Sequence, residues 1–545
     1  QARAWDRTLA AGGKLTAEEE GKRKRHPLDR FDEVAARARE GVFPKGVDVF
    51  LTKWQGLFYV APNQNSFMCR MRMPGGILSA HQLRGIAALA EGCAGGYADV
   101  TTRANLQLRE IPANKAVEVL WALADLGLTS RGAGGDNVRN VTGSPTAGID
   151  PAELIDTRPH ARAIHHWILN HRALYGLPRK FNIAFDGGGR VPVLEDTNDI
   201  AFTAVTVQDG FGIAPGVYYR LALGGITGHR DFARPTGVVV APNDTTAVCD
   251  AILRVFIREG DRTDRKRARL KYVLDRWGME RFLFETEQQL GRALSRVPAE
   301  ACSAPNEQDR SGHLGVHAQK QPGLNYVGVA LPVGRMDPGQ MRGLAAIADR
   351  HGNGEIRLTV WQNLLIPGIR DEAVAAAQEA IRALGLDWQV NPIRAGLVSC
   401  TGAAGCRFAA SHTKQHALAL AEWLEQRIAV AMPLNIHLTG CHNSCAQHFI
   451  ADIGLLGAKV ERGEEMVEGY DLHVGGGAGP DARIGRLVRP KVAQDELGPA
   501  VLALLRVWQR DGAGESFIAF TERLDDAALG ALCAADPEAA VMEPA

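Results

Sequence analysis

Two stretches of the chain decide its fold: HQLRGIAALA at residues 81–90 and GQMRGLAAIA at residues 339–348. Six of the ten positions are identical, and the second stretch follows the first at a distance of 258 residues. Three further residues recur at the same distance, because Pro74, Thr101 and Asn105 return as Pro332, Thr359 and Asn363. Matches at one fixed spacing indicate an internal duplication, which has to be recognised before any fold is predicted.

The duplication continues downstream at a slightly different spacing. The dipeptides Asn182-Ile183 and Asp199-Ile200 return as Asn435-Ile436 and Asp452-Ile453. We therefore predict two copies of a unit of about 250 residues, each a smaller piece followed by a larger one. Because an alternating strand precedes a helix and a second alternating strand in each copy, the fold class is α+β or α/β.

The strands predicted in the first copy have one apolar and one basic face. Alternation over residues 67–73 places Arg70 and Arg72 opposite the apolar side chains. Alternation over residues 102–109 gives a second polar set, namely Arg103, Asn105, Gln107 and Arg109. A solvated outer face is the ordinary explanation for one such strand. Two neighbouring strands whose basic faces coincide favour a surface that binds an anion or a cofactor.

Composition excludes several classes of protein. A chain of 545 residues is too long to fold around one hydrophobic core. Because 62 basic residues balance 62 acidic ones, the net charge does not indicate nucleic acid or an anionic membrane as a partner. No apolar run approaches the roughly 20 residues that span a bilayer. Nine cysteines are too few for a disulfide framework. We predict a multidomain cytoplasmic enzyme that binds neither nucleic acid nor membrane.

Residues 1–46 are polar and show no periodicity, and they include the basic run from Lys22 to Arg25. We predict an extended N-terminal arm. A solvated tail is the simpler interpretation, and docking of an acidic protein is the alternative.

Four cysteines form a cluster in the second copy. Cys400 and Cys406 are separated by five residues, Cys441 and Cys445 by three, and the two pairs by 34. Zinc sites usually have tighter pairs, whereas a [4Fe–4S] cluster needs four thiolates. A predicted helix near residues 420–428 and a short strand at 436–438 place both pairs in loops on one side of a sheet. Glycines beside the cysteines permit close approach to an inorganic core, at Gly402, Gly405 and Gly440.

These cysteines belong to the motifs CTGxxxC and TGCxNSC, which resemble the cluster-binding signature of the sirohaem-dependent nitrite and sulfite reductase family. The resemblance covers roughly residues 28–515 and is nearest to the ferredoxin-dependent nitrite reductases. It also includes the motifs at residues 99–103, 136–140, 177–182, 317–321 and 357–359. The family shares the internal duplication, so two independent observations agree.

The resemblance implies an architecture with a pseudo-twofold axis. Residues 47–130 and 308–390 pair into one ferredoxin-like domain, residues 131–307 form a first sirohaem-binding α/β domain, and residues 391–515 form a second that carries the cysteines. A C-terminal tail follows at residues 516–545. The cofactors implied are sirohaem and a [4Fe–4S] cluster bound by Cys400, Cys406, Cys441 and Cys445. Cys445 is expected to bridge a cluster iron and the sirohaem iron.

Matching the family's motifs residue by residue implies an anion pocket of Arg70, Arg139, Lys180 and Asn182. Guanidinium and ammonium groups attract an oxyanion and donate hydrogen bonds to its departing oxygens. Sirohaem carries eight carboxylates, and their burial is unfavourable unless cations or hydrogen-bond donors surround them. The candidates for this second role are Arg103, Gln107, Arg109, Lys320 and Asn363, together with Cys445.

The activity implied is the six-electron reduction of nitrite to ammonium. Sulfite reduction is the nearest alternative, and Asn182 favours nitrite because sulfite enzymes of the family usually carry a second lysine there. An electron-transfer protein that holds only the cluster is a remote alternative. No Gly-x-Gly-x-x-Gly follows a predicted strand, and the run from Gly475 to Gly479 lacks that spacing. We therefore expect an external donor, a small acidic carrier such as ferredoxin.

Overall fold

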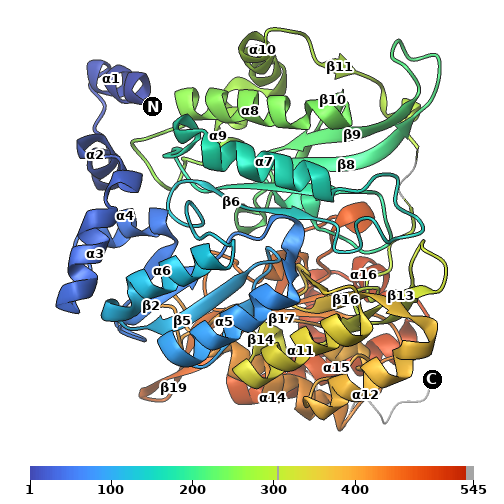
Figure 1. Ribbon diagram of the computed structural model, residues 1–545. Helices are drawn as coiled ribbons and strands as arrows, with labels where there is room; N and C mark the ends of the chain where they lie inside the picture. The colour runs from blue at the N-terminus through green and yellow to red at the C-terminus, as the bar shows by residue number, and fades with distance from the viewer. Residues whose placement is uncertain (304–305, 513, 535–545) are drawn as a thin grey trace.

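The computed structural model describes residues 1–303, 306–512 and 514–534. Two similar halves build its central domain (Figure 1). Each half forms a sheet with two helices packed against it. The first half comprises β1 (Leu57–Val60), β2 (Ser66–Arg70), α5 (Ala80–Cys93), β4 (Ala98–Val100), β5 (Leu106–Ile111) and α6 (Ala116–Asp125). The second comprises β12 (Gly315–Ala318), β13 (Leu324–Val329), α11 (Pro338–His351), β15 (Glu355–Leu358), β16 (Leu364–Arg370) and α12 (Val374–Ala383).

The halves exchange short strands. β3 (Ile77–Ser79), from the first half, pairs with β15 of the second, and β14 (Arg335–Met336), from the second half, pairs with β4 of the first. The strand orders are therefore β1-β2-β5-β4-β14 and β12-β13-β16-β15-β3. The exchange ties the halves into one domain, as the resemblance implied.

The repeated residues of the two decisive stretches have matching structural roles. Gln82 and Gln340 each complete a capping box at the start of α5 and α11. Gly85 and Gly343 allow close helix packing, because a Cβ there would lie 2.3 Å from Leu126 and Leu384 respectively. Arg84 and Arg342 form ion pairs across to the opposite helix, with Asp349 and Glu91 respectively. The duplication thus repeats the helix capping boxes, the close packing at a glycine and the ion pairs between α5 and α11.

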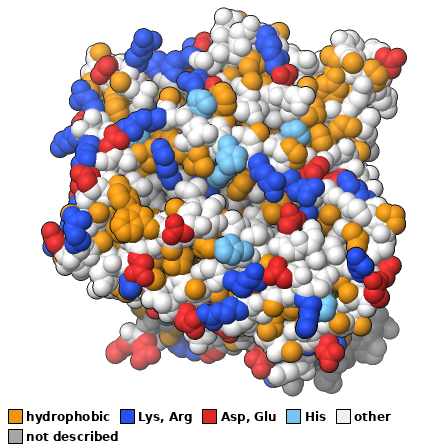
Figure 2. All heavy atoms as spheres, viewed as in Figure 1, with side chains coloured by type: hydrophobic (Ala, Val, Ile, Leu, Met, Phe, Trp, Pro, Cys, Tyr) orange, Lys and Arg blue, Asp and Glu red, His pale blue; other side chains and the backbone are white. Residues whose placement is uncertain are grey.

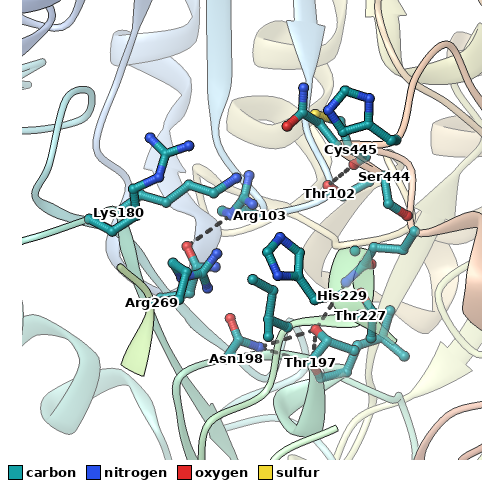
Figure 3. Close-up of a pocket in the computed structure, with 18 of the residues that line it drawn as sticks. Thr102, Arg103, Lys180, Thr197, Asn198, Thr227, His229, Arg269, Ser444 and Cys445 are labelled. Atoms are coloured by element: carbon teal, nitrogen blue, oxygen red, sulfur yellow. Dashed lines mark hydrogen bonds between the residues drawn. The ribbon is translucent and has the colours of Figure 1, made fainter. Parts of the chain in front are cut away.

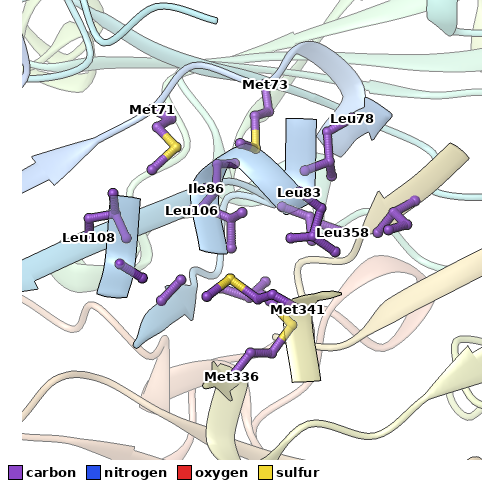
Figure 4. Close-up of a cluster of buried hydrophobic side chains, with 14 of the residues drawn as sticks. Met71, Met73, Leu78, Leu83, Ile86, Leu106, Leu108, Met336, Met341 and Leu358 are labelled. Carbon is purple, nitrogen blue, oxygen red and sulfur yellow. The ribbon is translucent and has the colours of Figure 1, made fainter. Parts of the chain in front are cut away.

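The core of the central domain draws on both halves (Figure 4). Met71, Leu83 and Leu106 of the first half pack in one cluster with Met336 and Met341 of the second. All five are fully buried. Burial of this kind is the main favourable contribution to folding, so neither half has a complete core without the other.

Two larger sheets follow the two halves in sequence, and both begin with three parallel strands. The first sheet contains β6 (Val138–Gly143), β7 (Phe181–Asp186), β8 (Ile200–Val207), β9 (Gly216–Leu223), β10 (Arg234–Val240) and β11 (Ser295–Arg296), with helices α7 (Arg158–Asn170), α8 (Thr245–Glu259), α9 (Leu270–Trp277) and α10 (Met279–Leu290). The second contains β17 (Gly396–Ser399), β18 (Asn435–Thr439), β19 (Ile453–Arg462), β20 (Glu465–Val474) and β21 (Arg486–Ala493), with α14 (Thr413–Glu425) and α15 (Leu497–Asp511). The predicted helix and strand between the cysteine pairs correspond to α14 and β18.

The downstream repeat also has a structural basis. Asp199 accepts a hydrogen bond from the backbone N–H of Asn182 at 2.8 Å, and Asp452 does the same for Asn435 at 2.6 Å. Each aspartate thereby joins the start of one strand to the start of its parallel neighbour.

The prediction of an extended N-terminal arm was wrong. Residues 1–46 contain α1 (Ala2–Ala10), α2 (Ala17–Lys24) and α3 (Phe31–Glu40), which line one edge of the molecule (Figure 1). Trp5 and Leu15 are buried. Lys22, from the basic run, is buried as well, so it is not available to dock another protein. The helices pack because a few apolar side chains and buried ion pairs suffice where the overall pattern is polar.

The prediction of a C-terminal tail was also wrong for the residues described. Residues 516–534 contain α16 (Phe517–Glu522) and α17 (Asp526–Ala534). Phe517, Phe520 and Leu529 belong to the core of the second large sheet. The rest of the predicted tail, residues 535–545, lies outside the described residues.

The predicted strand at residues 102–109 is shorter than expected. β5 starts only at Leu106, because residues 101–105 form a turn in which Ala104 has a φ of 49°. Leu106 and Leu108 still face the core, while Gln107 and Arg109 face the opposite side. Arg72, which we placed on the polar face with Arg70, lies beyond the end of β2 and is buried.

Among the described residues, no helix is long and apolar enough to cross a membrane. The face in Figure 2 shows basic and acidic side chains interspersed, in keeping with the balanced charge.

Candidate active site

Two cavities meet at the junction of the central domain and the two large sheets. Cavity 1 has a volume of about 500 Å³ and cavity 2 of about 260 Å³. Thr102, Arg103 and Cys445 line both. Thr102 Oγ1 donates a hydrogen bond to the Cys445 carbonyl at 2.9 Å, so the turn before β5 is fixed to the loop of the last cysteine.

Cavity 1 is strongly basic. Lys180, Arg103 and Arg269 lie on one side of it, opposite Ser444 and Cys445 (Figure 3). The residues preceding β7 supply Lys180, β7 itself supplies Asn182, and the loop between α8 and α9 supplies Arg269. The further cations that line cavity 1 are Arg179, Arg265, Lys266 and Arg267.

Hydrogen bonds fix the position of the polar groups in cavity 1. Arg103 Nε donates to Asn182 Oδ1 at 3.2 Å. Arg269 Nη2 lies 2.7 Å from Asp199 Oδ2, the carboxylate that also holds the Asn182 backbone. Burial, together with the charges of Arg269 and Arg103, lowers the pKa of Lys180 well below its ordinary value. A pocket that disfavours its own lysine charge in this way favours binding of an anion.

All four motif cysteines line cavity 2. β5 contributes Gln107 and Arg109 to the same cavity. Arg109 joins β5 to the first cysteine loop, because it donates to Thr401 Oγ1 at 2.7 Å and to the Gly405 carbonyl at 3.3 Å. The sheet face that sequence alternation made polar therefore faces the cysteines.

The cysteine sulfurs have hydrogen-bond donors beside them. The Gly440 N–H lies 3.2 Å from Cys400 Sγ, and Asn443 Nδ2 lies 3.5 Å from Cys441 Sγ. Burial raises the pKa of the Cys400 and Cys441 thiols. Within the described residues, no three His, Cys, Asp or Glu side chains converge tightly enough to hold one metal ion. Four thiols spread around a cavity suit a larger [4Fe–4S] cube, in which donors to sulfur tune the potential.

The glycines beside the cysteines make close contacts with protein atoms. A Cβ at Gly402 would lie 2.5 Å from the Thr413 nitrogen, and a Cβ at Gly440 would lie 2.6 Å from Ala409. We predicted instead that these glycines make room for an inorganic core. Their small size lets the two cysteine loops and the start of α14 pack together.

Arg70 and Arg139, which we predicted in one anion pocket with Lys180 and Asn182, do not line cavity 1. Arg70 lines cavity 2, with its guanidinium carbon 4.7 Å from the centre of the Phe58 ring. Arg139 lines neither cavity; it is buried and donates to the carbonyls of Ala133 and Gly135, while its Nε has no hydrogen-bond partner in the part of the chain that the structure describes. Burial and neighbouring guanidinium groups lower the pKa of Arg70 to about 9, and that of Arg139 falls too. The two side chains thus belong to one cationic group, because the charge of Arg70 contributes to the lowered pKa of Arg139.

Two predicted cofactor residues are not brought to either cavity. Lys320 forms an ion pair with Glu153 at 2.6 Å. Asn363 is buried, and its Oδ1 accepts a hydrogen bond from the Leu331 N–H at 2.9 Å. Asn105, its counterpart in the first half, donates to the Met71 carbonyl at 2.7 Å. The repeated asparagine therefore joins backbone segments within each half, and we no longer assign it to the cofactor.

Sequence reasoning missed the basic loop between α8 and α9. Its signal was present, because residues 262–269 read RTDRKRAR. The run has no strand or helix periodicity, so it resembles any exposed basic segment. Sequence reasoning also missed Lys414, which lines cavity 2 and lies 3.6 Å from Asp99 Oδ1; it is a single lysine in the first turn of α14, with no motif around it.

The residues present fit the implied cofactors. Sirohaem needs partners for eight carboxylates, and cavities 1 and 2 together are lined by twelve Lys and Arg side chains. The buried Nε of Arg139 has no hydrogen-bond partner among the described residues, whereas that of Arg109 lies 3.4 Å from Asp99 Oδ2. A buried donor without a partner, such as Arg139 Nε, is expected to be satisfied by a ligand or an ordered water. The four cysteines line cavity 2, and Cys445 lines cavity 1 as well, so the proposed cluster site adjoins the basic cavity.

Comparisons with known proteins identify the family of the chain. The family described as "Nitrite and sulphite reductase 4Fe-4S domain" matches residues 134–294 and 394–524, and the "Nitrite/Sulfite reductase ferredoxin-like half domain" matches residues 59–126 and 317–384. Ferredoxin–nitrite reductase of Leptolyngbya laminosa is 40% identical over 83% of this chain and 88% of its own. The Synechococcus elongatus protein of that name is 38% identical over 94% and 99%.

A solved structure shows the same fold over nearly the whole chain. The NirA protein of Mycobacterium tuberculosis superimposes with a TM-score of 0.89 at 31% identity, covering 96% of this chain and 99% of that one. With the family matches in both halves, the relatives and the four cysteines at a basic junction, the chain belongs to the nitrite and sulphite reductase family, whose cofactors are sirohaem and a [4Fe–4S] cluster.

Proposed function

We propose that this chain reduces nitrite to ammonium with six electrons from reduced ferredoxin. The observation that carries the proposal is the junction of cavities 1 and 2. Cys445 lines both cavities, and the neutral Asn182 lines cavity 1 among its basic side chains. The similar cyanobacterial and plant proteins named ferredoxin–nitrite reductase support the choice of substrate and donor.

The bound sirohaem and cluster supply the redox chemistry, and the chain's own residues supply binding, orientation and protons. Arg70 and Arg139 are proposed to attract the anion and to stabilise charge on its oxygens. Arg103, Gln107 and Arg109 are proposed to pair with carboxylates of sirohaem. Cys400, Cys406 and Cys441 are proposed to hold the cluster, and Cys445 to join it to sirohaem.

Lys180 is proposed to hold and donate protons. Because its pKa is lowered by burial and by neighbouring cations, the ammonium proton is easier to release than that of an exposed lysine. An anion bound in cavity 1 stabilises the ammonium form of Lys180 by its charge.

Asn182 is proposed to set the choice between nitrite and sulfite. Its Oδ1 accepts a hydrogen bond from Arg103, so its NH₂ group remains as the donor toward cavity 1. A neutral donor suits the monoanion nitrite, whereas sulfite near neutral pH is partly dianionic and gains more from an added positive charge.

The donor is proposed to be ferredoxin or a similar small acidic carrier, and the location is proposed to be the cytoplasm. Docking of an acidic carrier is partly electrostatic, so turnover with ferredoxin should weaken as ionic strength rises. Efficient turnover driven by NADPH with the purified chain alone would contradict this part of the proposal.

Steady-state assays of purified holoenzyme test the proposed substrate. Nitrite and sulfite are compared under one artificial reductant, so that the donor does not affect the ratio. We expect the larger kcat/KM for nitrite. A larger value for sulfite would replace nitrite with sulfite as the substrate and leave the fold unchanged.

A further inference from the structure

The loop between α8 and α9 brings four cations to cavity 1: Arg265, Lys266, Arg267 and Arg269. Lys266 and Arg267 are exposed, so the loop forms part of the cavity's mouth. Like charges so close together repel one another. The loop therefore needs anchors outside the cavity to keep its position.

Helix α2 provides such anchors through buried groups. Glu19 Oε2 lies 2.7 Å from Arg262 Nη1 at the start of the loop, and it also accepts a hydrogen bond from Trp5 Nε1. The backbone N–H of Thr16, the N-cap of α2, donates to the Arg262 carbonyl at 3.2 Å. Lys22 forms an ion pair with Glu19, and both side chains are 1% exposed or less.

Asp136 extends this network to the cavity lining. Lys22 Nζ lies 3.1 Å from Asp136 Oδ2, and Arg265 donates two hydrogen bonds of 2.9 Å to the same carboxylate. Asp136 is fully buried. A continuous chain of charges, Glu19 to Lys22 to Asp136 to Arg265, therefore leads from α2 to cavity 1.

The glycine-rich loop just before Asp136 holds the Arg139 side chain in position. Arg139 binds the carbonyls of Ala133 and Gly135 in this loop. A Cβ at Gly135 would lie 2.3 Å from the Trp54 ring, so the loop packs directly on that ring. Lys22 Nζ is 5.9 Å from the centre of the same ring. Lys22 thus contacts Asp136, which binds Arg265, and also the Trp54 ring, on which the loop that binds Arg139 packs.

We propose that Lys22 is a positioning residue for the sirohaem site: through Asp136 it fixes Arg265 and the loop that holds Arg139, and so determines how firmly the cavity retains its carboxylate-rich cofactor. Helix α2 acts in this way although none of its described residues lines cavity 1. The inference rests on the proposed function, because it takes sirohaem as the occupant.

The test measures release of sirohaem from purified holoenzyme. The loaded protein is diluted into an excess of a haem-scavenging apoprotein, and the visible absorption of sirohaem is followed with time. Lys22→Met keeps the apolar part of the side chain but removes its charge. We expect it to release sirohaem about tenfold faster than the wild type, because Glu19 and Asp136 each lose one cationic partner in a buried site. Lys22→Arg should restore the rate to within about twofold, since it returns a cation.

Matched controls come from the same helix. Lys24 is exposed and forms no ion pair among the described residues, so Lys24→Met should release sirohaem at the wild-type rate. In case Lys22→Met does not fold, Glu18→Gln provides a milder test. Glu18 is half-buried and lies 3.4 Å from Arg265 Nε, so its loss weakens the anchor without leaving a buried charge. We expect release about twofold to threefold faster, with Glu20→Gln unchanged.

The cluster provides the internal reference, because its cysteines lie on elements that α2 does not support. The acid-labile sulfide content and the spectrum of the cluster should therefore stay at wild-type values in Glu18→Gln and Lys22→Met. Equal release rates in both variants and the wild type would overturn the proposal, as would parallel loss of cluster and sirohaem. A wild-type protein that takes up no sirohaem at all would instead contradict the proposed function.

Discussion

Arg103 Nε donates a hydrogen bond to Asn182 Oδ1 at 3.2 Å, across the junction between the central domain and the first large sheet. The bond leaves the Asn182 amide group able only to donate toward cavity 1. It also means that any cation placed at position 182 has a guanidinium as its neighbour. The residue proposed to select the substrate, Asn182, is therefore hydrogen-bonded directly to a residue proposed to bind sirohaem, Arg103.

Replacing Asn182 with lysine should shift the preference toward sulfite. An added charge in a partly desolvated site is worth about 1 kcal/mol or more, and about 1.4 kcal/mol corresponds to a tenfold change in rate. We expect Asn182→Lys to raise the ratio of kcat/KM for sulfite to that for nitrite by about tenfold, as measured with one reductant. Asn182→Gln, which adds no charge, is the control. A ratio that rises equally in both variants would show that charge is not the cause.

Removing the Lys180 amine should impair both substrates alike. Lys180→Ala takes away one cation and one proton donor, and the loss of a single group that stabilises developing charge costs about a hundredfold in kcat. We expect kcat for nitrite and for sulfite to fall by similar factors, with the sirohaem spectrum retained. A selective effect on one anion would assign Lys180 to specificity instead.

Cys445→Ser should disturb both cofactors, because one thiolate is proposed to serve both irons. Cys533 provides the matched control: it is buried in α17 and belongs to the core of the second large sheet, away from the motif. Absorption spectra and iron content of the two purified variants decide the outcome. Normal cluster and sirohaem spectra in Cys445→Ser would rule out the bridging assignment.

Asp196 should make stability depend on pH. It faces a separate cavity of about 400 Å³, and its Oδ1 has no hydrogen-bond partner among the described residues. Burial and the neighbouring Glu195 raise the pKa of Asp196 to about 7. The folded protein thus keeps a proton that the unfolded chain releases near pH 4, so the contribution is complete below that pH and is lost as pH rises through 7.

Asp196→Asn removes this titration. We expect the variant to be more stable than the wild type at pH 8, by as much as about 4 kcal/mol, and to lose most of that advantage at pH 4. Denaturant unfolding at the two pH values measures the difference. The same advantage at both pH values would contradict a raised pKa for Asp196.

Much of the fold was accessible from the sequence because duplication repeats physical requirements. Gln82 and Gln340 recur as helix caps, and Gly85 and Gly343 recur where a side chain does not fit. The exchange of β3 and β14 was not predictable, because strands of two or three residues carry no periodic pattern. The helices of residues 1–46 were missed because their polar sequence conceals buried pairs such as Lys22 with Asp136.

The candidate site was predictable where a motif or an alternation marked it. The four cysteines, Arg109 and Asn182 all lie at the two cavities. Lys320 and Asn363 do not, because an ion pair and a backbone hydrogen bond engage them, and a sequence shows neither contact. Arg265, which lines cavity 1, forms a salt bridge with Asp136, 129 residues away in the chain, and a sequence does not show such a contact.

The electron count of the reaction tests the central claim most directly. Purified holoenzyme is given a known amount of nitrite and an excess of reduced ferredoxin, and both the ferredoxin oxidised and the ammonium formed are measured. The account predicts one ammonium for each nitrite and six ferredoxins oxidised for each ammonium. Consumption of one or two ferredoxins per nitrite, with nitric oxide or hydroxylamine as the product, would contradict it.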